Sequence, residues 1–147
     1  NRRPPQPRPD FIITGPGFVG SSFVGSRQSI LLDAKYRDLW QNELPREMLY
    51  QLAIYAMSQP RGATAAILYP TEDSAAREAL IDIRDPFDDS VRAHVALRPI
   101  VIPSLLELIR SGDTRERDWA RLGLFLVQGA SGARWETPAS QTFTTSI

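Results

Sequence analysis

The stretch "LLDAKY" at residues 31–36 holds the single lysine of a chain that has sixteen arginines. Asp33 precedes Lys35 by two positions, so on a strand both side chains point to the same face. The compact ammonium of lysine changes its pKa readily when it is buried, whereas the arginine guanidinium is a wide planar fork that stays charged. The stretch therefore predicts a site with a small cation beside a carboxylate. An ordinary Asp–Lys ion pair at a strand end is the alternative.

A second carboxylate, Asp10, begins an earlier strand candidate, "PDFIIT" at residues 9–14. It lies beside Asp33 if the two strands form a hairpin. Two close carboxylates repel each other unless a cation sits between them, and a hard divalent cation such as Mg²⁺ prefers oxygen ligands of this kind. The lysine then adds a positive charge that metal binding does not use up. Such a set suits phosphodiester hydrolysis, in which the metal polarises a phosphoryl oxygen and lowers the pKa of an attacking water.

The helix candidate that follows this strand carries a polar stripe. Glu47, Gln51 and Tyr55 are spaced four residues apart, which places them on one face of a helix. If that face looks onto the strand with Asp33 and Lys35, the polar groups share one cleft. In the simpler interpretation, Tyr55 belongs to the core and Gln51 to its boundary.

These motifs, in this order, resemble those of the PD-(D/E)XK nuclease superfamily: "PD" at 9–10, "DAK" at 33–35 and "QLAIY" at 51–55. The Gln-x-x-x-Tyr helix is similar to that of the RecB-like branch. The run "RPDFIIT…ILLDAKY…YQLAIYA…AAILYP" resembles the nuclease domain of McrC, the cleaving subunit of 5-methylcytosine-directed restriction systems. The late "WARLGLFLVQG" is similar to that family's closing helix, so the likeness covers about residues 8–129.

The resemblance implies a restriction-endonuclease-like α/β fold, with a central mixed sheet flanked by helices. It also implies a Mg²⁺- or Mn²⁺-dependent endodeoxyribonuclease of an antiphage restriction system. By this likeness, Asp10, Asp33 and the backbone carbonyl of Ala34 bind the metal. Lys35 orients or activates the water and stabilises charge at the phosphate.

Gln51 and Tyr55, by the same resemblance, support the site or touch the nucleic-acid backbone. The family's partner is a separate AAA+ GTPase ring (McrB-like) that recognises or translocates DNA, and this chain has no GxxxxGK[ST] loop of its own. Family members also take an acidic residue from a helix upstream of the "PD" strand, which this sequence does not include. We therefore expect a missing N-terminal part of the same protein, on which activity depends.

The chain divides into a Pro- and Arg-rich linker remnant at 1–8, a nuclease domain at 9–129 and a polar C-terminal tail at 130–147. Strands that alternate with helices favour a mixed or mostly parallel sheet. Pro45 suits the first position of a helix. Besides the strand at 9–14, the expected elements are a glycine-rich loop or hairpin tip at 15–27, strands at 29–36, 63–70 and 91–102, helices at 44–59, 104–109 and 113–129, a segment at 74–83 that starts helical and becomes a strand able to pair with 91–102, and a turn at 85–90.

Composition excludes several classes of function. The absence of cysteine excludes disulfides, thiolate zinc sites and cysteine nucleophiles. The single histidine, His94, excludes sites that need two imidazoles, and we expect no acidic partner near it. The 17 basic and 17 acidic residues balance, so a strongly basic nucleic-acid footprint is missing. No run is long enough to cross a bilayer, and we expect a cytoplasmic protein.

A dinucleotide-binding Rossmann-type unit is a rival interpretation. "GPGFVG" at residues 15–20 matches GxGxxG after a strand candidate, and Asp33 lies near the place of the ribose-binding acid. The motif requires a helix after its third glycine, yet "SSFVGSRQS" follows, with Gly25 inside it and no helical stripe. A third interpretation is a catalytically inert assembly module with a nuclease fold.

Two further features stay open. Trp40, just after the strand, either stacks on a nucleobase or caps the core. Asp85, Asp88 and Asp89 form an acidic turn that lacks the ligand spacing of an EF-hand.

Overall fold

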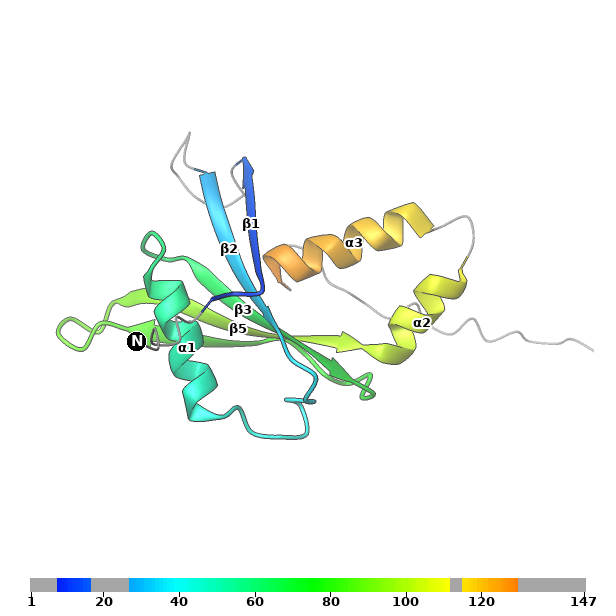
Figure 1. Ribbon diagram of the computed structural model, residues 1–147, viewed down its shortest axis with the longest axis horizontal. Coiled ribbons are helices and arrows are strands. Elements are labelled where there is room, and N and C mark those ends of the chain that lie inside the picture. The colour runs from blue at the N-terminus through cyan, green and yellow to red at the C-terminus, as the bar shows by residue number, and fades with distance from the viewer. Residues whose placement is uncertain (1–7, 17–26, 112–114, 130–147) are drawn as a thin grey trace, which may run out of the picture.

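The computed structural model describes residues 8–16, 27–111 and 115–129, and shows a mixed sheet with helices beside it (Figure 1). No helix in these ranges has the length and apolarity to cross a membrane. The elements are β1 (Phe11–Pro16), β2 (Arg27–Ala34), α1 (Arg46–Met57), β3 (Thr64–Thr71), β4 (Ala79–Arg84), β5 (Val91–Val101), α2 (Ile102–Arg110) and α3 (Arg115–Gln128).

The five strands lie in the order β1-β2-β3-β5-β4. The three inner strands β2, β3 and β5 are parallel, and the edge strands β1 and β4 run antiparallel to their neighbours. This confirms the expected mixed α/β sheet. Parallel neighbours need a crossover connection, and the segment that carries α1 supplies it between β2 and β3. α1 consequently packs against β3 and β5 on one face of the sheet.

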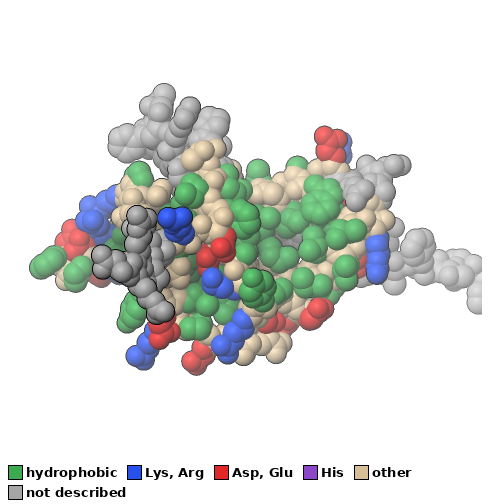
Figure 2. Space-filling model, in the orientation of Figure 1, with side chains coloured by type: hydrophobic (Ala, Val, Ile, Leu, Met, Phe, Trp, Pro, Cys, Tyr) green, Lys and Arg blue, Asp and Glu red, His purple; other side chains and the backbone are tan. Residues whose placement is uncertain are grey.

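The main core lies between α1 and this face of the sheet. Leu52, Tyr55 and Ala56 of α1 are buried against it. Ala65, Ile67, Tyr69, Ala93 and Val95 come from β3 and β5, and Leu31 from β2. A smaller cluster on the opposite face is centred on Leu32, Ala66 and Ala96. In the face that Figure 2 shows, hydrophobic side chains gather in the middle, and charged side chains of both signs are interspersed around them.

β2 ends at Ala34, two residues earlier than the expected 29–36. The Lys35 amide still donates to the Leu68 carbonyl at 2.9 Å, which continues the parallel ladder for one step. The next donor on β3 in this pattern would be residue 70, and Pro70 has no N–H. The ladder therefore stops, and Tyr36 leaves the sheet. β3 itself continues through Pro70 to Thr71, so Pro70 ends the neighbouring strand rather than its own.

α1 begins at Arg46, within the expected range 44–59. Pro45 is therefore the N-cap, one position before the first helical residue, where it was expected to lie. The Pro45 carbonyl accepts from the amides of Met48 and Leu49. The missing N–H of proline costs nothing in this place, since the groups that precede a helix have no intrahelical acceptor.

The expected helical start at 74–83 is wrong. Residues 72–78 form turns, and only β4 is regular. The Asp73 carboxylate accepts from the Ala75 amide at 2.8 Å, and Arg77 donates to the carbonyls of Ser74 and Ala76. Side-chain bonds of this kind compete with helical backbone bonds, so alanines and a glutamate were not enough to form a helix here.

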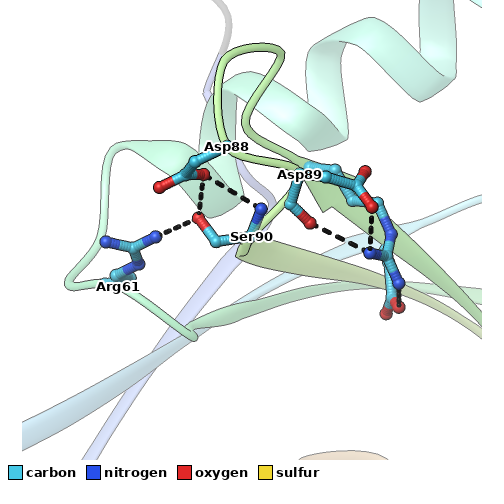
Figure 3. A network of polar contacts seen from close by, with 6 residues as sticks. Arg61, Asp88, Asp89 and Ser90 are labelled. Carbon is cyan, nitrogen blue, oxygen red and sulfur yellow. Dashed lines mark hydrogen bonds and ion pairs between the residues drawn. The ribbon is translucent and has the colours of Figure 1, made fainter.

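β4 and β5 form the expected antiparallel pair, and the turn 85–90 joins them. The acidic residues of this turn are used locally: Asp88 accepts from the amide and hydroxyl of Ser90, and Arg61 also donates to that hydroxyl (Figure 3). Asp89 has φ 56°, a left-handed conformation that aspartate tolerates better than most residues. The turn is thus a closed hydrogen-bonded structure.

His94 has an acidic partner after all. The β4–β5 register places it opposite Asp82, and its Nδ1 lies 3.0 Å from the Asp82 carboxylate. The expectation of no acid nearby was wrong, because the acid comes from a strand twelve residues away.

A buried arginine ties the end of α3 to the sheet. The Arg98 side chain is only 4% exposed; its Nε donates to Glu78 Oε1 at 2.7 Å, and its Nη1 donates to the Leu126 carbonyl at 2.6 Å. Gly129 follows α3 with φ 74°, and a Cβ at this position would overlap the Glu78 carboxylate. The left-handed φ favours glycine here, and the close approach of Glu78 adds a second reason for it.

We predict that Arg98→Ala lowers the free energy of unfolding by about 3 kcal/mol or more, because it leaves a partly buried carboxylate and a helix-terminal carbonyl without this donor. Arg84→Ala, which removes an exposed ion pair with Asp89, is the control and costs less than about 1 kcal/mol. Urea unfolding measures both. Equal losses would show that Arg98 does not hold α3.

Candidate functional site

The β1–β2 hairpin brings the two predicted carboxylates to one place. Phe11 is paired with Leu32, so the next position outward on each strand sets Asp10 across from Asp33. Asp10 Oδ2 accepts a hydrogen bond from the Ala34 amide at 2.8 Å. The antiparallel β1–β2 pairing that the sequence left as a condition is present, and the Asp10 side chain bonds across the end of it.

Asp33 and Lys35 form an ion pair on the α1 side of the sheet. Asp33 is 3% exposed, and one of its carboxylate oxygens contacts the Lys35 ammonium. The pKa of Lys35 is raised: its hydrogen bond to Asp33 outweighs the opposing effect of burial, and the charges of Asp33, Asp10 and Tyr55 add to the rise. The lysine is therefore a stable cation that lies near both aspartates.

α1 places its polar pair beside this lysine. Tyr55 is 5% exposed and belongs to the main core, as the simpler interpretation held. Its hydroxyl also accepts a hydrogen bond from Gln51 Nε2 at 2.6 Å, and a Coulombic interaction with Tyr55 contributes to the raised pKa of Lys35. Tyr55 thus contributes its ring to the core and its hydroxyl to the polar group around Lys35.

Tyr69 forms the floor next to Lys35. Asp33 is paired with Ile67 in the parallel ladder, so two residues further Lys35 lies beside Tyr69. Tyr69 is 2% exposed, and burial, helped by the charge of Asp38, raises its pKa to about 12. It stays neutral, and the sequence showed it only as part of an apolar strand.

The six predicted site residues therefore gather at the carboxyl end of β2. Asp10, Asp33 and Lys35 approach one another, Ala34 is bonded to Asp10 through its backbone, and Gln51 reaches the group through Tyr55. Over the described ranges, no three acidic, histidine or cysteine side chains are grouped so that they could hold a metal ion. The candidate metal ligands are two carboxylates and backbone oxygen.

A hydrogen-bonded loop beside the site was missed by the sequence analysis. The Asp38 carboxylate accepts from the amides of Trp40 and Gln41 and from the Thr71 hydroxyl, the last at 2.7 Å. The pKa of Asp38 is lowered overall. Desolvation, the largest single contribution, raises it, but the three hydrogen bonds together lower it by more. The Trp40 indole nitrogen donates to Asp73 at 2.9 Å, and the residue is 44% exposed. An aspartate that bonds backbone amides two and three residues ahead is a recognisable turn signal.

The glycine motif has a different setting from a dinucleotide-binding loop. Gly15 lies in β1, and residues 17–26, with the rest of the motif's glycines, fall outside the described residues. β1 and β2 are antiparallel neighbours, whereas a Rossmann unit joins parallel strands through a helix.

We predict that Asp38→Ala lowers the free energy of unfolding by roughly 1 kcal/mol at neutral pH, the usual net value of such hydrogen bonds. The folded pKa is lowered, so this stabilisation is present above the unfolded pKa and disappears as the pH falls through the folded value. Urea unfolding at neutral pH and at roughly pH 3 measures the loss at each pH. Glu43→Ala, at an exposed carboxylate, is the control; a pH-independent loss would contradict this account.

Comparison with known proteins finds no relative of this chain. No protein-family model matches the chain. No curated protein and no solved structure matches it either.

Proposed function

We propose that this chain is a metal-dependent nuclease domain with a restriction-endonuclease-like fold, which hydrolyses phosphodiester bonds in DNA. The observation that carries the proposal is the hairpin end where Asp10 bonds the Ala34 amide beside the Asp33–Lys35 pair. Two carboxylates and one lysine at the carboxyl end of a parallel strand are the set that the sequence suggested for this chemistry. The mixed sheet with α1 across it supports the same proposal.

The donor chemistry fits a hard divalent cation. Asp10 and Asp33 offer carboxylate oxygens from opposite strands, and Mg²⁺ or Mn²⁺ takes oxygen ligands. In a strand, the N–H and C=O of one residue point to the same side. Since the Ala34 N–H points to Asp10, its carbonyl is available on the same side as a third oxygen. A bound cation would polarise a phosphoryl oxygen and lower the pKa of a nearby water.

Lys35 supplies positive charge to the reacting phosphate. Its raised pKa keeps it protonated, so it acts as a hydrogen-bond donor to a water or to phosphate oxygens, where negative charge develops. Tyr55, hydrogen-bonded to Gln51, and Tyr69 are both buried on this side of the sheet, and their rings supply the apolar surroundings of the site.

The remaining parts of the proposal concern partners. The chain has equal numbers of acidic and basic residues, so long-range attraction to DNA is weak. We propose that a separate AAA+ GTPase ring delivers DNA to the site. An inert assembly module with the same fold is the alternative, and the metal test below separates the two.

We predict that Mg²⁺ or Mn²⁺ raises the melting temperature of the protein. A ligand at ten times its Kd adds about 1.4 kcal/mol to stability by mass action, which is roughly 3–6 °C for a domain of this size. Asp33→Asn removes the shift while the fold persists, since the amide has the same shape. The control is Asp88→Asn, in the turn between β4 and β5, which keeps the metal-dependent shift in melting temperature. A melting temperature indifferent to millimolar divalent cation would favour the inert module.

We predict that Lys35→Ala abolishes metal-dependent DNA cleavage by the full-length protein, with a loss of at least about 100-fold, and weakens DNA binding much less than cleavage. Lys35→Arg keeps the charge beside Asp33, and hence the fold, but rescues poorly because its fork does not fit the same place. Arg92→Ala, at an exposed ion pair, is the control in the plasmid assay. Full activity of Lys35→Arg would return the lysine to a structural role.

A further inference from the structure

The residue after the candidate lysine is an aromatic ring in open solvent. Tyr36 is 99% exposed, and Trp40, four residues later, is 44% exposed. Aromatic side chains normally bury most of their large surface. Two exposed rings in one short loop, directly after Lys35, form an aromatic surface that a ligand bound at the lysine can cover.

This loop, residues 36–42, is held in shape before any ligand binds. Asp38 bonds the amides of Trp40 and Gln41 and the hydroxyl of Thr71, and Asn42 Nδ2 donates to the Asp38 carbonyl at 2.7 Å. The Trp40 ring is fixed at its edge by Asp73, which leaves its exposed part free for contact. A prearranged loop loses little conformational entropy on binding.

We propose that the 36–42 loop is a stacking platform for an unpaired nucleobase next to the phosphate that Lys35 contacts. This inference rests on the proposed function and adds a substrate class to it: single-stranded or locally opened DNA at the point of cleavage. Tyr36 supplies the first stacking surface, and the exposed part of Trp40 supplies a second.

Chain geometry links the lysine to the ring. Consecutive Cα atoms are about 3.8 Å apart, so a strand whose phosphate contacts Lys35 has its neighbouring nucleotides within reach of the Tyr36 ring. Each of these nucleotides carries a sugar and a flat base. Base–aromatic stacking does not depend on sequence, since every base has a π-face. Paired bases inside a duplex offer no such face, which is why the base must be unpaired.

The neighbours of the rings favour nucleic acid over a protein partner. Aromatic anchors of protein interfaces sit in an apolar patch that excludes water. Here Leu39 is buried in the core, and the other intervening and following residues are polar or charged: Arg37, Asp38, Gln41, Asn42 and Glu43. Arg37 Nη2 donates to Asn42 Oδ1 at 3.2 Å, so a guanidinium is also held on this loop, where it can meet a second phosphate.

The test is binding of fluorescent single-stranded oligothymidylate, measured by anisotropy at low salt in calcium, with a matched oligomer of abasic sugar-phosphate units. We expect Tyr36→Ala to weaken binding of the oligothymidylate by about five- to hundredfold and binding of the abasic oligomer by less than about twofold. Tyr36→Phe keeps the ring and binds as the unaltered protein does. Trp40→Ala gives a smaller loss than Tyr36→Ala, because less of that ring is exposed.

Phe87 provides the matched control. It is 97% exposed, in the turn between β4 and β5, so Phe87→Ala removes an equally exposed ring away from the site and leaves binding unchanged. Equal binding by Tyr36→Ala and the unaltered protein, or equal losses for the two oligomers, would overturn the platform even if Lys35 variants lose cleavage. Base-dependent binding through Tyr36 with no metal-dependent cleavage would keep the platform and reject the nuclease.

Discussion

The parallel pairing of β2 with β3 is the constraint on which the candidate site depends. Strands that run in the same direction cannot be joined by a tight turn, so the chain between Ala34 and Thr64 must cross the sheet and return. α1 is that return, and Leu52 and Tyr55 bury its inner side against β3 and β5. An antiparallel β2–β3 pair would need no helix here, and Lys35 would have no tyrosine beside it.

The same arrangement makes Asp33 costly without Lys35. A carboxylate that is 3% exposed loses most of its hydration, and a buried charge is tolerated only when it is paired and hydrogen-bonded. Lys35 provides the pair, and as a single ammonium on a flexible stem it does so within the narrow space beside Tyr69. This explains why a chain that otherwise uses arginine keeps one lysine, whether or not the pair is catalytic.

Local patterns of the sequence predicted the strands and α1 because each depends on residues close in sequence. Alternation and apolar runs marked β2, β3 and β5, and the stripe from Gln51 to Tyr55 marked the helix. Contacts between distant segments were not readable in this way. The Arg98–Leu126 bond spans twenty-eight residues and the Asp38–Thr71 bond thirty-three, and only the folded sheet brings these ends together.

The candidate site was predicted only in part from the sequence. The spacing of Asp33 and Lys35 predicted their common face, and their ion pair confirms it. The approach of Asp10 depended on a hairpin that the sequence made only conditional, and the fully exposed ring of Tyr36 could not be distinguished from a strand residue. Pro70 decides that point, because it ends the ladder one step before Tyr36 and turns the ring out of the sheet.

The pairing of Lys35 with Asp33 also couples the two ligands of the proposed site. While Asp33 is balanced only by Lys35, the ammonium has little charge to offer a phosphate. A divalent cation that shares the Asp33 carboxylate would free the lysine for that contact, so each ligand would strengthen the other. Such coupling is reciprocal by thermodynamic necessity. In an electroneutral chain, affinity for DNA at this site would then depend more on bound metal and on base stacking than on overall charge.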